Sequence, residues 1–265
     1  MSFSVNRAGE LEYLCADTLR GARHGFSTRF GGVSAGHLKS LNLGTHRGDD
    51  PANVAENYRR FCAALEIPVE DLVFAKQIHS DIVATVGSEN LGEGLARPVL
   101  SPRDALITDT PGTALVVFTA DCAPVLFYDP VHRAVGAAHS GWRGTAQDIA
   151  GKTAAAMTAA FGTCPEELHA AIGPCIRQCC FETDADVPEA MRAQLGAAAE
   201  EAIEARGEKF YVNNQRLIVL ELLRAGLRLE HIDVSDDCTA CQPDRFWSYR
   251  KAGDSRGSLA NIIAL

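Results

Sequence analysis

Four side chains that could do chemistry lie near the middle of the sequence, each at the end of an apolar run. Asp121 and Cys122 form one pair, and the motif His-Ser-Gly-Trp-Arg-Gly adds His139 and Arg143. A thiolate and an imidazole are good ligands for zinc and also suit copper. A cysteine that has a histidine as its base can instead act as a nucleophile. The residue types therefore indicate either a metal centre or hydrolase chemistry.

A second histidine, His79, ends an earlier apolar run that is typical of a strand. If one sheet edge brings it to Cys122 and His139, the three side chains form a ligand set for zinc, with copper as the alternative metal. Three protein ligands leave one position open for water or substrate, as in a catalytic site. The spacing is not a compact metal signature, so the residues alone leave open a Cys122 nucleophile with His139 as its base. Asp121 or Ser140 would assist that pair, and Asp121 could alternatively orient a metal ligand or act as a general base.

Two arginines could hold an anion. Arg29 lies where a short strand-like run meets a glycine turn, so its planar guanidinium could face an anion or simply be solvated. Arg143 precedes an alanine-rich segment, residues 147–161, which is predicted to be helical. Because helix N-termini attract anions, we expect a phosphate near Arg143. Trp142 and Phe181 could stack on a planar group such as a nucleobase, although aromatic residues more often belong to the core or its rim.

The composition argues against nucleic acid and membranes as partners. The chain has 265 residues, a formal charge of -9 and a sequence pI of about 5.4, and its basic residues form no run. No apolar stretch approaches the roughly 20 residues that span a bilayer, and the first residues lack a basic flank followed by an apolar region. We therefore expect a cytoplasmic protein that is not processed.

Nine cysteines without a secretory signal fit a reducing compartment better than a disulfide framework. Cys238 and Cys241 form a Cys-x-x-Cys motif, which could bind a second metal or cycle as a dithiol. No second such motif and no following pair of histidines accompanies it, so a structural role is the favoured interpretation. The crowded Cys175, Cys179 and Cys180 are interpreted in the same way, with a disulfide formed only on oxidation.

Hydrophobic periodicity predicts a chain of alternating strands and helices that forms one domain, residues 1–265. Asp50 and Pro51 are a typical N-cap and first residue of a helix. Further helices are predicted over 147–161, 188–206, and from Asn213 or Asn214 to about Gly226. Several predicted strands are apolar throughout, which suggests that both of their faces are covered. Predicted strands span 73–79, 82–86, 105–108, 114–118, 125–128, 134–138, 168–172, 231–234, 246–249 and 259–263, after a short one near 24–33.

The motifs TADCAPVLF, AAHSGWRGT, FSTRFGGVS, SLNLG, IGPCI, DDCT and WSYR, together with the element Gln-Ile-His, resemble the laccase-domain or "polyphenol oxidase" family. The resemblance runs from about His24 to the C-terminus. It implies an α+β domain in which mixed β-sheets pack face to face with helices on the outside, similar to the fold of a bacterial toxin deamidase. One departure is the run from Asp254 to Ser258, where the family often has Thr-Gly-Arg, which leaves any role of Arg256 in doubt.

The resemblance also implies an activity. His79, Cys122 and His139 would be zinc ligands in an enzyme that cleaves adenosine, inosine, guanosine and methylthioadenosine with inorganic phosphate and also deaminates adenosine. Arg143 or Arg29 would hold the phosphate. Asn42 and Gln77 are predicted to hydrogen-bond sugar or base.

Three alternatives to this activity are open. One is a Cys-His amidase that edits peptidoglycan precursors carrying L-serine, with Cys122 as nucleophile. Another is a copper-dependent polyphenol oxidase, which the sequence disfavours because only two of its eight histidines lie in the matched metal motifs. The last is a metal-binding or partner-binding protein without catalytic activity.

Overall fold

Two mixed six-stranded sheets form the centre of the protein, whose computed structural model describes residues 3–265. The first sheet has the strand order β1-β2-β3-β15-β7-β4 and is antiparallel except between β4 and β7. Its strands, in that order, are Phe3–Ala8, Leu11–Ala16, Arg23–Ser27, Leu259–Ala264, Ala114–Thr119 and Leu72–Phe74. The second sheet has the order β14-β10-β8-β9-β6-β5, with parallel pairs only at its two edges. Its strands, in that order, are Ile232–Val234, His169–Ile172, Ala123–Asp129, Ala134–Ser140, Ala105–Thr108 and Val83–Thr85.

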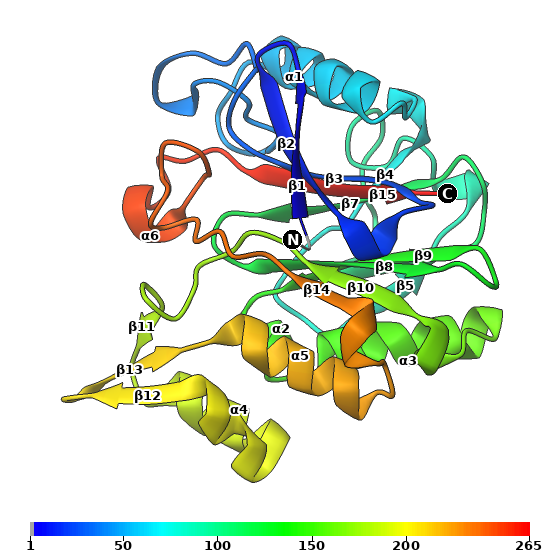
Figure 1. The fold of residues 1–265 in the computed structure, drawn as a ribbon. Coiled ribbons are helices and arrows are strands. Elements are labelled where there is room, and N and C mark those ends of the chain that lie inside the picture. Colours follow the sequence, from blue (N-terminus) through cyan, green and yellow to red (C-terminus); the bar gives the residue numbers. More distant parts are fainter. Residues whose placement is uncertain (1–2) are drawn as a thin grey trace.

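Helices cover the outer faces of both sheets, and a small three-stranded sheet lies to one side with α4 (Figure 1). Helix α1 covers the first sheet, whereas α3 and α5 cover the second. The helices are α1 Pro51–Ala64, α2 Trp142–Thr145, α3 Ile149–Phe161, α4 Asp186–Leu195, α5 Asn214–Arg224 and α6 Tyr249–Ala252. The small sheet has the order β11-β13-β12, with strands Glu182–Thr183, Lys209–Val212 and Ile203–Arg206. The α+β class with mixed sheets is thus confirmed.

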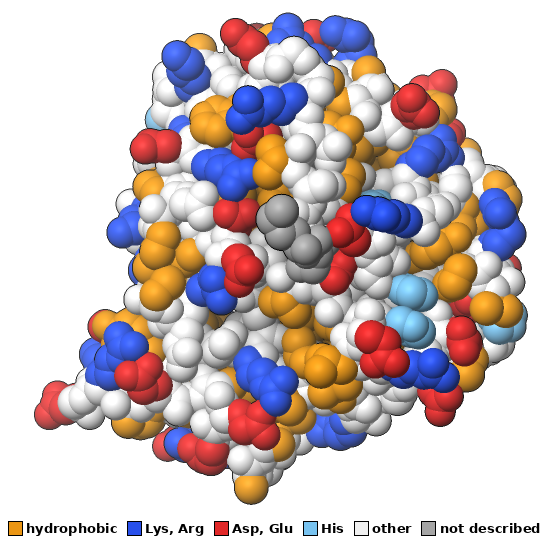
Figure 2. Space-filling model, in the orientation of Figure 1, with side chains coloured by type: hydrophobic (Ala, Val, Ile, Leu, Met, Phe, Trp, Pro, Cys, Tyr) orange, Lys and Arg blue, Asp and Glu red, His pale blue; other side chains and the backbone are white. Residues whose placement is uncertain are grey.

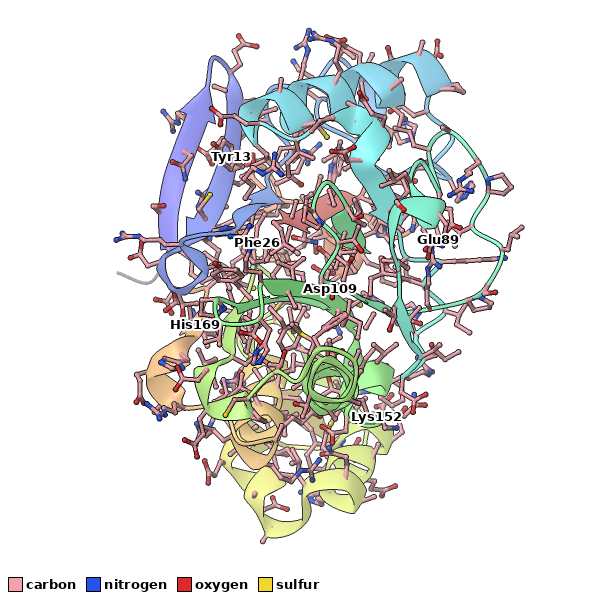
Figure 3. The ribbon with its side chains drawn as sticks, turned by 90° about the vertical axis from the view of Figure 1, so that its right-hand side faces the viewer. Tyr13, Phe26, Glu89, Asp109, Lys152 and His169 are labelled. Carbon is pink, nitrogen blue, oxygen red and sulfur yellow. The ribbon has the colours of Figure 1, made fainter. Side chains whose placement is uncertain are left out.

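A large part of the core lies between the two sheets. Alternate residues of β7 show why: Leu115 and Val117 face the second sheet, whereas Val116 packs on the side of α1. Phe26 of β3 is fully buried in the same inner layer (Figure 3). Strands with both faces covered need apolar residues at every position, which explains the continuous apolar runs in the sequence.

The first predicted helix is confirmed in detail. Pro51 begins α1, and the side chain of Asp50 accepts a hydrogen bond of 2.8 Å from the backbone N–H of Ala52. The helix predicted over 188–206 is wrong in its second half. Helix α4 ends at Leu195, because Gly196 takes a left-handed φ of 61°, and a 3-10 segment then leads into β12.

Two further predictions are corrected. The helix predicted over 147–161 is confirmed as α3, but it begins at Ile149, after Asp148 with a left-handed φ of 61°. Arg143 therefore lies in the separate short α2, not directly before a long helix. The strand predicted over 246–249 is absent from the described structure: Trp247 is buried, and its indole N–H donates to the backbone carbonyl of Leu41 at 3.0 Å.

Charged side chains of both signs are mixed over the visible face of the molecule (Figure 2). No large area of Lys and Arg alone lies on that face. Across residues 3–265, the helices are all too short or too polar to pass through a bilayer.

Candidate functional site

The structure brings His79, Cys122 and His139 together, and one potential ligand atom of each lies within 4.8 Å of the others. The Cys122 Sγ is 3.9 Å from Nε2 of His79. The two imidazole rings meet edge to face, with centroids 4.9 Å apart and an angle of 79° between their planes. We call these three side chains the His-Cys-His site.

Strand pairing explains two of the three positions. Cys122 comes directly before β8, and His139 lies near the end of β9, opposite Pro124 of β8. The antiparallel register therefore places the thiol and the imidazole at one edge of the second sheet. His79 arrives differently: β4 ends at Phe74, short of the predicted 73–79, so His79 lies in a loop with a left-handed φ of 61°.

A buried carboxylate, that of Asp104, fixes the positions of two of these side chains. This role was not predicted from the sequence. Asp104 is fully buried and accepts a hydrogen bond from Nδ1 of His139 at 2.8 Å. Its two oxygens also accept from the backbone N–H groups of residues 78 to 80 and from the hydroxyl of Ser80. The loop that carries His79 and the ring of His139 are therefore oriented by the same carboxylate, which leaves Nε2 of His139 as a ligand atom.

The electrostatics favour a thiolate at this site. Burial disfavours the charged thiolate, but the charge of His139 and hydrogen bonds from His139 and His79 lower the pKa of Cys122 to about 6. Burial also disfavours a charged His139, whereas Cys122 and the hydrogen bond to Asp104 raise its pKa to about 9. Burial opposes ionisation of Asp104 too, yet its bonds to His139 and Ser80 hold its pKa well below the usual value. A thiolate is the form of cysteine that serves either as a metal ligand or as a nucleophile.

A large cavity of about 710 Å³ opens on one side of the His-Cys-His site. Its lining contains several basic side chains and no acidic one: His46, Arg47, Lys76, Arg97 and Arg256. Burial lowers the pKa of Arg256, and repulsion by the guanidinium of Arg47 lowers it further. Such a lining favours a phosphate or another small anion.

A second cavity of about 330 Å³ opens on the other side and shares His79, Cys122 and Arg256 with the first. Aromatic side chains line it, together with polar ones that can form hydrogen bonds. These lining residues are Trp142, Phe181 and Tyr249, with Asp121, Arg143, Asn214 and Arg250. The walls can therefore take a planar group next to the reactive atoms.

The residues predicted from the sequence differ in their positions. Arg143 lines the second cavity, with its guanidinium 4.2 Å from the centroid of the Trp142 ring. Gln77 lines the first cavity, but its side-chain amide is already paired with the backbone of Phe118. The amide nitrogen donates to the carbonyl at 2.8 Å, and the amide oxygen accepts from the N–H at 2.6 Å. Asp121 is partly buried and takes a left-handed φ of 89°. Its carboxylate accepts from two hydroxyls and one backbone N–H, those of Thr239, Ser248 and Arg250.

The structure does not bring the other two predicted binding residues to either cavity. The guanidinium of Arg29 donates to the carbonyls of Lys39 and Pro243. Its central carbon lies over the ring of Trp247, 3.8 Å from the ring centroid. Asn42 is fully buried and bonds Asp49 and its own loop. These positions give both residues a part in the packing of their loops.

Sequence reasoning also missed most of the basic lining. Arg47 and Lys76 lie in loops without a motif that would mark them, whereas Arg256 was singled out only as a departure from the family pattern. Its position between both cavities restores it as a candidate binding residue.

The sequence comparisons identify the family of the chain. Residues 23–265 match the family described as "Multi-copper polyphenol oxidoreductase laccase". The chain belongs to this laccase-domain family. The chain is similar to the "Purine nucleoside phosphorylase YlmD" of Geobacillus stearothermophilus, with 34% identity over 252 residues, 94% of this chain and 91% of the relative. It is also similar to the "Purine nucleoside phosphorylase YfiH" of Escherichia coli, with 37% identity over 240 residues, 90% of this chain and 92% of the relative.

A solved structure shows that this laccase-domain protein shares its fold with a relative. The hypothetical protein YfiH of Bacillus licheniformis superposes with a TM-score of 0.93 and 31% sequence identity, and the match covers 98% of both chains. At this level of identity the agreement includes the two mixed sheets and the helices that cover them.

Proposed function

We propose that the protein is a purine nucleoside phosphorylase that works at the His-Cys-His site and also deaminates adenosine. The observation that carries this proposal is the meeting of two unlike cavities at the site. One has a basic lining suited to phosphate, and the other has an aromatic lining suited to a purine. The names of the relatives from Geobacillus and Escherichia coli support the same activity.

The donor set fits a zinc ion. Two imidazole nitrogens and a thiolate suit zinc well, and Asp104 supplies the hydrogen bond that a ligating histidine usually makes with its other nitrogen. Zinc bound there would supply a Lewis acid and an open coordination position. Copper takes the same donors, so the choice between the metals rests on the metal content of the purified protein.

Phosphorolysis requires the protein to orient phosphate toward C1′ of the ribose. An oxygen of the phosphate forms a bond to C1′ while the bond from C1′ to the base nitrogen breaks, and the base keeps the electron pair and takes a proton. Arg47 and Arg256 would hold the phosphate and its charge, while Trp142 and Phe181 would stack on the base. Asp121 would fix the wall between the cavities, because its carboxylate already accepts three hydrogen bonds.

A nucleoside turnover assay tests the proposal. Purified protein should convert adenosine and phosphate to adenine and ribose 1-phosphate, and the omission of phosphate should stop release of the base. Formation of inosine without phosphate would report deamination separately. His139→Ala should abolish both reactions, whereas Cys164→Ala, at an exposed cysteine outside both cavities, should keep them. If His139→Ala retains the wild-type rates, the activity belongs to another site or to a contaminant.

Two arginines separate phosphate binding from loop packing. Arg256→Ala should raise KM for phosphate by about tenfold, because one charge-assisted contact contributes about 1.5 kcal/mol or more. Arg29→Ala should leave this KM unchanged and lower thermal stability instead, since Arg29 bonds two carbonyls away from the cavities. An unchanged KM in Arg256→Ala would remove the proposed phosphate position.

A Cys-His amidase is the second candidate, and the protonation of the site favours it. Cys122, His139 and Asp104 follow one another as thiolate, imidazolium and buried carboxylate, which is the order of a nucleophile, the base that has taken its proton and an orienting carboxylate. Similarity to the fold of a toxin deamidase stays a prediction. Hydrolysis of an L-serine-containing peptidoglycan precursor by protein stripped of metal with a chelator would support the amidase, and dependence on added zinc would count against it.

A further inference from the structure

Four cysteines from two distant segments form a second cluster, outside the residues that line the two cavities. Cys179 and Cys180 follow β10, whereas Cys238 and Cys241 follow β14. Strands β10 and β14 are parallel neighbours, so the segments leave the second sheet at the same edge. A backbone bridge between Cys175 and Cys238 keeps the two segments together. We call the first four side chains the four-cysteine cluster.

The sulfur atoms of the cluster have the spacing of a metal site. Their separations are 3.8 Å for Cys179 and Cys180, 3.7 Å for Cys179 and Cys238, 3.5 Å for Cys179 and Cys241, and 3.3 Å for Cys180 and Cys241. All four sulfurs lie within 4.8 Å of one another. A tetrahedral zinc with bonds of about 2.3 Å to sulfur holds its ligands about 3.8 Å apart. A disulfide bond is only about 2.05 Å long, so these contacts are those of separate sulfurs around a common centre.

A backbone N–H group and two arginines lie where they would stabilise thiolates in the cluster. The N–H of Arg177 donates to Sγ of Cys238 at 3.4 Å, which stabilises a thiolate. The guanidinium of Arg177 binds the carbonyl of Asp236, and that of Arg250 binds the carbonyls of Cys180 and Glu182. Two positive charges therefore lie close to a group that would carry four negative thiolates.

We propose that the four-cysteine cluster binds one zinc ion as a structural site, distinct from the His-Cys-His site. Four thiolates complete the tetrahedral coordination of zinc and leave no position for substrate. The Cys-x-x-Cys pair, interpreted above as structural, supplies two of the ligands. The pair formed by adjacent residues in the other segment, Cys179 and Cys180, supplies what a second Cys-x-x-Cys motif would otherwise provide.

This zinc would stabilise one wall of the second cavity. Four residues that line this cavity lie near the cysteines in the sequence. Ile176 and Phe181 lie on either side of the adjacent cysteines, and Tyr249 and Arg250 follow the Cys-x-x-Cys pair. Thr239, between the two cysteines of the motif, donates to the carboxylate of Asp121 at 2.6 Å. The metal would therefore fix the loops next to Cys122 without taking part in the reaction.

Metal analysis of the purified protein tests the proposal without any assay of activity. The protein should be produced with zinc in the medium, kept reduced and passed through a chelating resin. Wild type should contain two zinc ions per chain, and His79→Ala should retain one. The double variant Cys179→Ser and Cys241→Ser should also retain one, whereas Cys164→Ser should retain both. Loss of nucleoside cleavage alone would leave these counts unchanged, so failure of the proposed function and failure of this site give different results.

A spectroscopic test covers the case in which the serine variant does not fold. Cobalt loaded into His79→Ala should give the intense visible absorption of a tetrahedral thiolate site, and X-ray absorption at the zinc edge should detect sulfur neighbours alone at about 2.3 Å. Absence of zinc from His79→Ala, nitrogen neighbours of the zinc in His79→Ala, or a disulfide within the cluster of the reduced protein would each overturn the proposal.

Discussion

The His-Cys-His site and the four-cysteine cluster use the same thiol chemistry in opposite ways. The first takes one residue from each of three distant segments, borders two cavities and rests on the fully buried Asp104. The second takes all its residues from two loops, and two of its cysteines are exposed. Three ligands next to open space suit catalysis, whereas four ligands without an open position suit the stabilisation of loops. The number of protein ligands and the space beside them therefore separate the two roles better than the presence of cysteine does.

Removal of the proposed catalytic thiol, that of Cys122, should give the largest effect. Cys122→Ala is expected to lower kcat/KM for adenosine phosphorolysis by about 10³-fold or more, because a metal at such a site stabilises the transition state by several kcal/mol. The zinc content should fall by one ion per chain. Steady-state kinetics and metal analysis on one preparation check both statements. Activity near that of wild type would remove Cys122 from the chemistry.

The opposite pattern is expected at the cluster. Cys238→Ser should lower the free energy of unfolding by more than about 3 kcal/mol, because loss of a bound metal is among the most destabilising changes. Any fall in kcat should be much smaller than for Cys122→Ala. Urea unfolding followed by circular dichroism, with and without a chelator, measures the first effect. The control Cys164→Ser should stay within about 0.5 kcal/mol of wild type, as is usual for surface changes.

A chelator that destabilises wild type and Cys238→Ser equally would contradict a metal in the cluster. If the cluster instead serves only as apolar packing, stability should follow the polarity of the side chain and not the presence of zinc. Cys238→Ala would then restore most of what Cys238→Ser loses. Unfolding curves of these two variants therefore distinguish ligation from packing.

The carboxylate behind the His-Cys-His site should give a smaller effect confined to that site. Asp104→Asn keeps one acceptor oxygen but places an amide N–H against backbone N–H donors of the loop that carries His79. Zinc affinity of the His-Cys-His site should fall by about 10- to 100-fold, as for other groups that orient metal ligands. Competition with a chromophoric chelator measures this affinity. The affinity of the four-cysteine cluster should not change, and a parallel loss at both sites would indicate general unfolding.

Asp104 also shows where sequence reasoning ends. Most strands of the two large sheets, the first helix and the meeting of His79, Cys122 and His139 could be predicted, because apolar runs and their polar ends are local signals. Asp104 acts through bonds to residues more than twenty positions away, and no local pattern marks it. Contacts of that kind depend on the register of β6 against β9 and on the path of a loop, which hydrophobic periodicity does not specify.

The four-cysteine cluster was missed for a related reason. The Cys-x-x-Cys motif was visible, but its partners are adjacent cysteines in another segment and become neighbours only through the parallel pairing of β10 and β14. The helix predicted over 188–206 failed differently. Its composition favours a helix throughout, yet Gly196 ends α4, and β12 finds strand partners in the small sheet.

The smallest of these effects tests how closely the His-Cys-His site is packed. A Cβ atom added at Gly141 would lie 3.0 Å from Sγ of Cys122 and 3.0 Å from Cδ2 of His79. The backbone of Gly141 has an ordinary φ of -68°, so Gly141→Ala should fold normally and displace only the side chains of Cys122 and His79. We expect kcat to fall by about tenfold, which is less than the 10²-fold that a displacement of 1 Å can cause. Cobalt spectra should shift for the His-Cys-His site and stay constant for the four-cysteine cluster, because the added methyl group contacts only the first.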